Sequence, residues 1–351
     1  MYLRENVPYT LTETESPSGY YGLQSPMTIS IDENGTVTVT NADSNYYTLV
    51  NTTPATLIIK NRPVAFQVIK YDKTGNNQET PLKGVKFDLY RKTDDGSTYV
   101  KVDAYSGKTS GANGLVNGID SQLPPGTYQL REISVPKGYR IPSAQEYVYF
   151  TVSPTGVFAL AANNAGDAAM QGPEEINNVW TYTLKVYNRR TPLTLQKFVS
   201  GNMANITEEF TFTINVYSDQ ACTKKINNPN PNQGGWENSV TRTGSVPAID
   251  LGNFPVGAYV KITESVNAQN YDKNEAAVNG GEKEELSNRT FIFQVPPLAE
   301  GQDSIPVEFT NTWNITVETG LVMDAAPYVL IISLGLVSAA VWLLLRRREN
   351  S

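Results

Sequence analysis

Two segments of the sequence, 9–20 and 128–139, share the pattern Tyr-x-Leu-x-Glu-x-x-x-Pro-x-Gly-Tyr and begin 119 residues apart. In an extended strand alternate side chains point to one face, so Glu13 and Glu132 share a face with the tyrosine and leucine that precede them. An ionised carboxylate on an apolar face is costly to bury, and we therefore expect each to be protonated or paired. The chain must fold as strands whose buried faces carry matched polar groups.

Candidate partners lie on two other strands between residues 63 and 190. The segment VAFQVIK places Lys70 on one face with three apolar residues, and YTLKVYN places Asn188 at the end of such a face. The sequence thus predicts that Lys70 on an early strand, Glu132 on a later strand and Asn188 on the last strand meet inside one domain. Lys73 is the reserve amine, but strand alternation points it outward.

The same order of residues occurs again further along the chain. The segments LTLQK, AYVKITE and IPVEFTN place Lys197, Glu264 and Asn311 on apolar faces. Residues 1–62 carry an incomplete set, because Glu13 is followed by ATLIIKN, which places Asn61 as an orphan acceptor without a lysine strand. The repeat period is about 125 residues, which is the size of one β-sandwich domain.

These repeats predict an all-β fold of tandem Ig-like or prealbumin-like sandwiches, followed by one transmembrane helix. Short joints at 61–63 and 188–192 indicate a stiff rod. Segments rich in Asn, Gly and Pro, 161–175 and 227–235, are expected to be surface loops. The expected divisions are 1–62, the last part of a truncated sandwich; 63–190, a sandwich; 191–316, a second sandwich; and 317–351, a C-terminal signal with a basic tail.

Composition excludes several classes of protein. The chain has 351 residues, a net charge of −7 and no basic stripe, which argues against a nucleic-acid binder. It has no His and one cysteine, Cys222, so we expect no metal site, no cofactor and no internal disulfide. Twenty Tyr, 26 Gly and 21 Pro favour strands and turns.

The C-terminal segment is typical of a membrane anchor. Residues 327–345 carry no charge and are long enough to cross a bilayer as a helix, and Arg346–Arg348 follow at once. The positive-inside rule places this basic tail in the cytoplasm and the preceding residues outside. A buried core helix is the alternative. The opening MYLRENVPYT lacks the apolar stretch of a signal peptide, so we expect either a piece of a longer protein or a misassigned start at Met1.

Lysine, glutamate and asparagine together offer the chemistry of amide exchange. Burial lowers the pKa of a lysine amine, which is a nucleophile when neutral, and an asparagine amide is an acyl donor. A protonated glutamate can stabilise the oxyanion and deliver a proton to the leaving ammonia. The expected product is a Lys–Asn isopeptide bond, formed once per site. The alternatives without a reaction are a lysine whose amine extends to the solvent and a polar pair at the edge of the sandwich. The repetition of the same residue order in two segments argues against both.

The segments that carry these residues resemble two known families. VIKYDKTGNNQETPLKGVKFDLYRK, GTYQLREISVPKGY and the terminal VYN resemble the CnaB-type, SpaA-like or prealbumin-fold domains of Gram-positive surface proteins. LTLQKFVSGN, NFPVGAYVKITES and VEFTN resemble the streptococcal-type pilin isopeptide-linkage domain. Together these cover most of 1–312. The resemblance implies the following roles: cross-linked residues Lys70, Asn188, Lys197 and Asn311; catalytic acids Glu132 and Glu264; and Glu13 and Asn61 in a truncated CnaB-type domain.

The tail VETGLVMD, with the span and the arginines, resembles a sortase sorting signal. The family's usual pentapeptide is Leu-Pro-x-Thr-Gly; here Thr319 and Gly320 are kept, and Glu318 stands where a Val-Pro-Thr-Gly variant has proline. The resemblance implies cleavage after Thr319 by a sortase-type transpeptidase and transfer to peptidoglycan or to another pilin subunit. The shaft motif Tyr-Pro-Lys does not occur, so no polymerisation lysine is assigned.

The combined interpretation is a Gram-positive cell-surface structural protein, either a pilin subunit or the stalk of a wall-anchored adhesin, made as a membrane-anchored precursor. The alternatives are an adhesin that binds a host surface ligand and an uncleaved type I membrane protein with an Ig-like ectodomain. An enzyme with turnover is disfavoured, because the chain lacks histidine and any nucleophilic serine motif. A thioester at Cys222 is a minor alternative, since SDQACTKK is typical of a polar loop.

Overall fold

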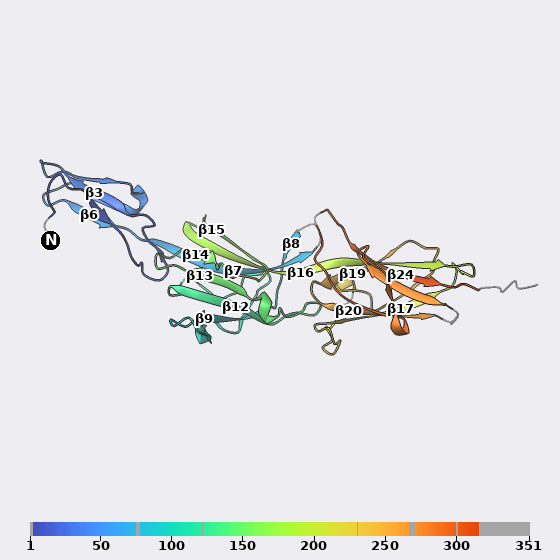
Figure 1. Ribbon diagram of the computed structural model, residues 1–351. Coiled ribbons are helices and arrows are strands. Elements are labelled where there is room, and N and C mark those ends of the chain that lie inside the picture. Colours follow the sequence, from blue (N-terminus) through green and yellow to red (C-terminus); the bar gives the residue numbers. More distant parts are fainter. Residues whose placement is uncertain are drawn as a thin grey trace, which may run out of the picture.

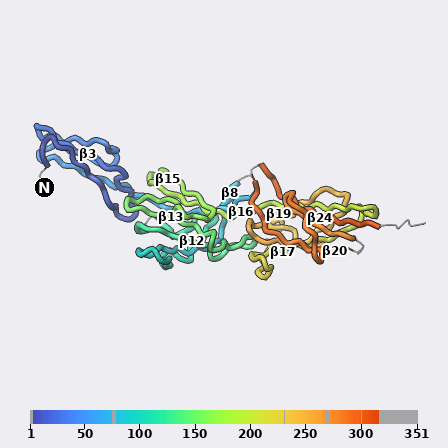
Figure 2. The backbone as a smooth tube through the Cα atoms, viewed as in Figure 1, coloured from blue at the N-terminus to red at the C-terminus, as the bar shows by residue number. Residues whose placement is uncertain are grey.

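The computed structural model describes residues 3–74, 78–120, 122–229, 231–266, 271–299 and 301–315. Figure 1 shows a rod of three β-rich modules placed end to end, and Figure 2 shows that they follow one another in sequence order. The all-β prediction is confirmed. Within these ranges no helix is long and apolar enough to cross a membrane. The expected cleavage residues Thr319 and Gly320, the span 327–345 and the basic tail 346–348 lie outside the described residues.

The middle module is a sandwich of two sheets. One has the strand order β10-β9-β12-β13-β14, with β11 paired to β9; the other places β16 between β7 and β15, and β8 pairs with β7. Apolar residues at alternate positions of the inner strands fill the space between the sheets. The elements are β7 (Arg62–Thr74), β8 (Gln78–Pro81), β9 (Lys86–Lys92), β10 (Tyr99–Lys101), η2 (Asp103–Tyr105), β11 (Lys108–Thr109), β12 (Gly126–Ser134), η3 (Ala144–Glu146), β13 (Val148–Val152), β14 (Phe158–Leu160), β15 (Ala168–Ile176) and β16 (Val179–Ser200).

The C-terminal module repeats this two-sheet plan. One sheet has the order β18-β17-β20-β23, and the other places the second half of β16 between β19 and β24, followed by β21 and β22. A large aromatic core, which includes the fully buried Trp236, lies between them. The elements are β17 (Phe210–Tyr217), η4 (Pro231–Gln233), β18 (Ser239–Arg242), β19 (Ile249–Pro255), β20 (Tyr259–Val266), β21 (Lys273–Val278), β22 (Glu284–Glu285), η5 (Ser287–Arg289), β23 (Thr290–Gln294) and β24 (Ile305–Thr312).

The first module is thinner than the other two. Its sheets are β1-β3-β4 and β5-β6, while β2 pairs with the start of β7. Among the described residues its buried core consists of Leu23, Met27 and Tyr46, and Leu11 and Ile59 are exposed. The elements are β1 (Tyr9–Leu11), β2 (Tyr20–Tyr21), β3 (Met27–Ile31), β4 (Val37–Thr40), η1 (Ser44–Tyr46), β5 (Tyr47–Val50) and β6 (Thr56–Ile59).

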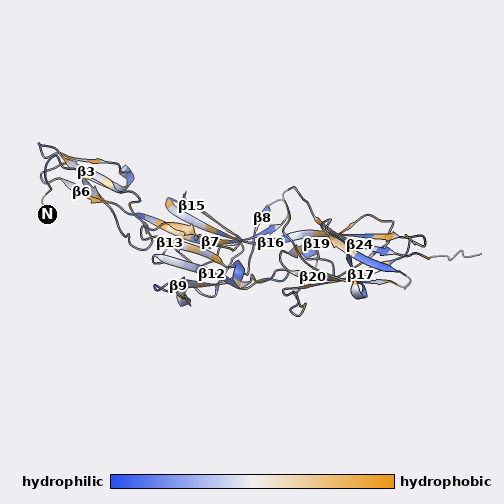
Figure 3. Ribbon diagram, viewed as in Figure 1, coloured by the Kyte–Doolittle hydropathy of each residue, from blue (hydrophilic) through white to orange (hydrophobic). Residues whose placement is uncertain are grey.

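Strand β16 belongs to two modules at once. Its residues from Trp180 to Arg190 pair with β7, and those from Arg190 to Leu195 pair with β19. The polypeptide therefore passes from the middle module to the C-terminal module without leaving the extended conformation. Figure 3 shows apolar residues along β7 and β13 in the middle of this arrangement, where the two sheets face each other.

The prediction of a surface loop at 161–175 is wrong in its second half. Residues from Ala168 onward form β15, which pairs antiparallel with β16. The polar, glycine-containing sequence gives a weak strand signal, but the free edge of β16 supplies the backbone partners that local propensity does not reveal.

Candidate functional site

The lysine-bearing and asparagine-bearing strands are parallel neighbours in both large modules. In the middle module Lys70 lies opposite Val186 in the β7–β16 register, and Asn188 follows two residues later on the same face. Lys197 and Asn311 have the same offset in the β16–β24 pair. The glutamate strand, β12 or β20, lies in the facing sheet. The two modules thus bring one residue of each type together by the same strand geometry.

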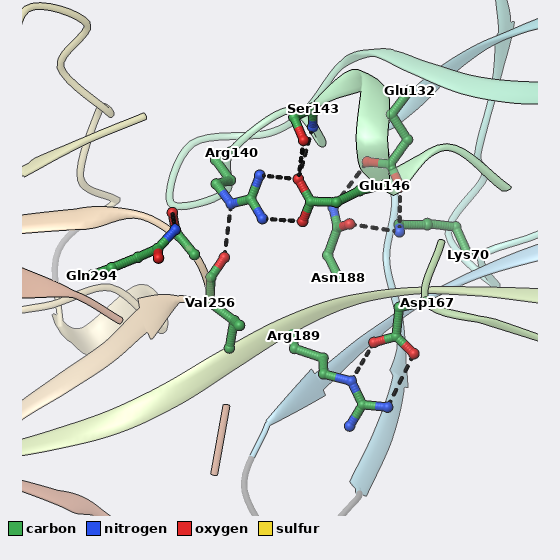
Figure 4. A network of polar contacts seen from close by, with 11 residues as sticks. Lys70, Glu132, Arg140, Ser143, Glu146, Asp167, Asn188, Arg189, Val256 and Gln294 are labelled. Carbon is green, nitrogen blue, oxygen red and sulfur yellow. Dashed lines mark hydrogen bonds and ion pairs between the residues drawn. The ribbon is translucent and has the colours of Figure 1, made fainter. Parts of the chain in front are cut away.

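In the middle module the three side chains contact one another directly (Figure 4). The Lys70 Nζ lies 2.6 Å from Glu132 Oε1 and 2.8 Å from Asn188 Oδ1. The Asn188 Nδ2 donates to the other carboxylate oxygen, Glu132 Oε2, at 3.1 Å. Each residue is therefore hydrogen-bonded to both of the others.

Burial sets the chemistry of this cluster. The Lys70 side chain is fully buried and Glu132 nearly so. Burial lowers the pKa of the Lys70 amine, and the neighbouring Glu132 carboxylate opposes this shift. A lysine in this environment is more readily neutral, and hence more nucleophilic, than a lysine in water.

The C-terminal module holds the equivalent cluster in a more sealed environment. The Lys197 Nζ lies 2.7 Å from Glu264 Oε1, both side chains are fully buried, and Asn311 Nδ2 donates to Glu264 Oε2 at 2.8 Å. The lysine amine also lies 4.1 Å from the centre of the Phe210 ring. Burial lowers the pKa of Lys197 to about 8.

The two clusters differ in their hydrogen bonding. Within the described residues, the Lys197 amine and the Asn311 Oδ1 atom have no partner in hydrogen-bond geometry, although the amine and the Glu264 carboxylate are in ion-pair contact. The middle cluster, by contrast, already has its lysine donating to the asparagine carbonyl oxygen. The C-terminal cluster thus lacks the hydrogen bond from the lysine amine to the asparagine carbonyl oxygen that the middle cluster has.

The first module brings two of the three residue types together. The Asn61 Nδ2 donates to Glu13 Oε1 at 2.8 Å, and the Leu23 amide donates to Glu13 Oε2 at 2.7 Å. No lysine among the described residues forms an ion pair with Glu13, and β6 pairs only with β5 there. A cavity of about 560 Å³ borders Glu13, Asn61 and Ile59 instead.

A smaller cavity of about 180 Å³ lies beside the middle cluster and borders Glu132 and Asn188. Its wall includes two ion pairs, Arg140 with Glu146 and Arg189 with Asp167 (Figure 4). Arg140 also donates to the Val256 carbonyl of the C-terminal module at 2.7 Å. A molecule as small as water or ammonia can therefore occupy the space next to the asparagine amide.

The remaining sequence candidates lie away from these clusters. Lys73 points outward, with its amine 4.9 Å from the centre of the Tyr187 ring. Cys222 lies in a turn, where its thiol makes a weak contact with the Gln220 carbonyl. Within the part of the chain that the structure describes, no group of His, Cys, Asp and Glu could hold a metal ion.

Sequence reasoning missed the residues that surround the middle cluster. Asp72 and Arg190 form a buried ion pair immediately beyond it. The available signal was spacing, because Asp72 follows Lys70 by two residues and Arg190 follows Asn188 by two, which places all four on one face. Arg140 gave no such signal, since it lies in a loop.

A comparison with known families gives one match, which lies within the middle module. Residues 67–165 match the family of SpaA prealbumin-like fold domains. No curated protein matches the sequence.

Several solved structures of pilus proteins show a distant likeness. The major pilin of Streptococcus pyogenes is 16% identical, with a TM-score of 0.32, and the match covers 72% of this chain and 99% of that chain. The minor pilin GBS52 of Streptococcus agalactiae is 14% identical, with a TM-score of 0.35, and the match covers 73% of this chain and 98% of that chain. A C-terminal fragment of the pilus adhesin SpaC of Lactobacillus rhamnosus GG is 12% identical, with a TM-score of 0.29, and the match covers 72% of this chain and 98% of that chain. These scores are low, so the function is inferred from the chain's own side chains.

Proposed function

We propose that this chain, whose residues 67–165 match the SpaA prealbumin-like domain family, is a structural protein of the cell surface that cross-links itself. One isopeptide bond joins Lys70 to Asn188, and a second joins Lys197 to Asn311. The observation that carries the proposal is the repeated meeting of a buried lysine, glutamate and asparagine from the same three strand positions.

The reaction in the middle module begins with a proton transfer from the Lys70 amine to the Glu132 carboxylate, 2.6 Å away. The neutral amine attacks the side-chain carbon of Asn188, and the new C–N bond forms as the negative charge moves to Oδ1. Glu132 passes a proton from the attacking nitrogen to Asn188 Nδ2, to which it is already hydrogen-bonded. The bond from the carbon to Nδ2 then breaks and ammonia leaves.

Contact between the groups replaces a stronger catalyst. The three side chains are held together by folding, and such a fixed arrangement is equivalent to a very high local concentration of amine. The Lys70 amine is already in contact with the amide, which favours its attack over that of a water molecule in the neighbouring cavity. Each site reacts once, and the proton that Glu132 took from the Lys70 ammonium departs with the ammonia as ammonium, which returns the glutamate to its carboxylate form. The intact mass of the chain tests this reaction, because each bond removes one ammonia molecule.

The bonds serve the stability of a rod. By analogy with a disulfide that closes a loop of more than 100 residues, each bond stabilises its module by about 5 kcal/mol. The joined strands are also the first and last of each module, so tension along the rod passes through covalent bonds. This property suits a pilin subunit or an adhesin stalk, and the sorting-type tail suits attachment to the wall or to a neighbouring subunit.

The tail provides a separate prediction for the cell surface. We expect Thr319 to become the C-terminus of the mature protein, because it precedes an apolar span and a tail whose three arginines resist transfer across a bilayer. The substitution Thr319→Ala should leave the chain in the membrane fraction with its span intact. Cell walls digested with a muralytic enzyme should release a form that ends at Thr319; full-length chain found only in membranes would overturn attachment.

The first module yields another prediction, since no lysine in the described part of the chain forms an ion pair with Glu13 beside Asn61. A peptide with the sequence of β7, residues 62–74, carries a lysine after alternating apolar residues and can pair in parallel with the free edge of β6. We expect this peptide to join the full chain covalently with loss of one ammonia, as measured by intact mass.

Two controls bracket this result. A peptide with arginine in place of the lysine at 70 should form no adduct, and neither should a chain with Glu13→Ala. An adduct that survives Glu13→Ala would show that the peptide reacts elsewhere and that the first module is not a cross-linking site.

A further inference from the structure

The parallel strands β7 and β16 carry a second pair of interacting side chains, one step beyond the middle cluster. Asp72 lies opposite Asn188, and Arg190 follows two residues later. This is the same diagonal offset that relates Lys70 to Asn188. A shift of β7 against β16 would therefore break both contacts together.

The Asp72–Arg190 contact is a bidentate ion pair that is almost completely buried. Arg190 Nε donates to Asp72 Oδ1 at 3.1 Å, and Arg190 Nη2 donates to Asp72 Oδ2. The Arg190 side chain is 10% exposed and the Asp72 side chain is 7% exposed. A planar guanidinium that meets a carboxylate at two points fixes direction as well as distance.

Further contacts orient the two members of the pair. Arg190 Nη1 donates to the Gly234 carbonyl of the C-terminal module, and the guanidinium lies 5.0 Å from the centre of the Tyr139 ring. The Tyr139 hydroxyl bonds to Asp72. The pair is thus held from the middle module, through Tyr139, and from the C-terminal module, through Gly234.

The C-terminal module has no ion pair at the equivalent positions. The residues equivalent to Asp72 and Arg190 are Val199 and Trp313, which pack against its hydrophobic core. Apolar packing takes the place of the ion pair there. The Lys197–Asn311 site is consequently a reference within the same molecule.

From these contacts we infer that Asp72 and Arg190 are positioning residues for the middle cross-link: they hold β7 and β16 in the register that brings the Lys70 amine to Asn188. This inference rests on the proposed isopeptide reaction. Neither residue touches the reacting atoms. Their effect is on how often the unreacted chain places amine and amide in contact, and a small misplacement of reacting groups lowers a rate strongly.

The test is the rate at which each bond forms in newly made full-length chain. Cell-free synthesis is stopped, aliquots are quenched in acid at intervals, and the peptides joined at Lys70–Asn188 and Lys197–Asn311 are measured by mass spectrometry after digestion. We expect Arg190→Lys, which keeps the charge but loses the two-point contact, to slow the middle bond about tenfold or more. The Lys197–Asn311 bond in the same chains should form at its normal rate.

A double variant and a matched control guard against simple misfolding. Asp72→Asn with Arg190→Gln leaves no lone buried charge, so the module should fold yet still form its bond slowly. Arg91→Lys changes an exposed pair with Asp94 that involves the end of β9, in the other sheet of the middle module, and should leave both rates unchanged.

Three outcomes are distinguishable. Slow middle bond formation in both altered chains, with Arg91→Lys normal, supports the positioning role. Normal rates in Arg190→Lys and in the double variant overturn it, even if small-angle scattering shows a looser joint between the modules. Absence of both bonds from the natural chain refutes the isopeptide reaction itself.

Discussion

The intact chain should weigh two ammonia molecules less than its sequence mass. Both large modules hold a buried amine beside a carboxylate and an asparagine amide, and amide exchange releases one ammonia at each site. Mass spectrometry of the denatured full-length chain measures this difference directly. Digestion should then yield peptides joined at Lys70–Asn188 and at Lys197–Asn311.

Substitution of the glutamates should restore the missing mass one site at a time. In Glu132→Ala the Lys70 amine loses both its proton acceptor and the group that protonates the leaving nitrogen, so one ammonia equivalent should return. Glu264→Ala should act likewise at the other site, and the double variant should have the full sequence mass. Glu13→Ala is the matched control, and should keep the deficit of two. A natural chain of unreduced mass would contradict the central proposal.

The polar clusters could be predicted because strand alternation is strict. Lys70, Glu132 and Asn188 each end a run of apolar residues of the same parity, and a buried face that carries three such groups must bring them together. The repeat of the pattern with Lys197, Glu264 and Asn311 supplied independent support. Order and parity were sufficient here, since they do not depend on the exact ends of strands.

The parallel register could not be predicted from the same pattern. Parity shows that Lys70 and Asn188 face the same side, but it does not distinguish direct opposition from the diagonal offset that the structure shows. Spacing alone likewise did not single out Asp72 and Arg190, because charged residues at a module boundary are ordinarily solvated. They are covered from both modules, by Tyr139 and by the segment around Gly234, and such tertiary contacts leave no trace in the local sequence pattern.

The first module shows where the pattern misleads. Tyr9, Leu11 and Glu13 have the same parity as their counterparts in the middle module, yet Leu11 is exposed and Glu13 only half-buried. A strand face becomes a core only when another layer covers it. Here the described residues supply a small core around Met27 and leave the cavity beside Glu13 open.

Mechanical extension should show the largest effect of the cross-links. When the rod is pulled from its ends, tension enters β7 and crosses to β16 at Lys70–Asn188. It then follows β16 for one short segment and crosses to β24 at Lys197–Asn311. The residues between the joined positions, 71–187 and 198–310, lie outside this path and carry no load. The two large modules of the natural chain should therefore not unfold and extend at forces that unfold ordinary β-sandwich domains.

A single substitution should make one module extensible. In Glu132→Ala the load must pass through 71–187, and unfolding should release roughly 400 Å of chain at about 3.5 Å per residue. Glu264→Ala should release a similar length from 198–310. The first module, for which no cross-link within the chain is proposed, should extend in every variant and serve as the internal marker. The measurement is force spectroscopy on the full chain held by its two ends in detergent. A natural chain that shows three unfolding steps would mean that its load path is not covalent, because a bond at Lys70 or Lys197 cannot coexist with release of the segment that it bypasses.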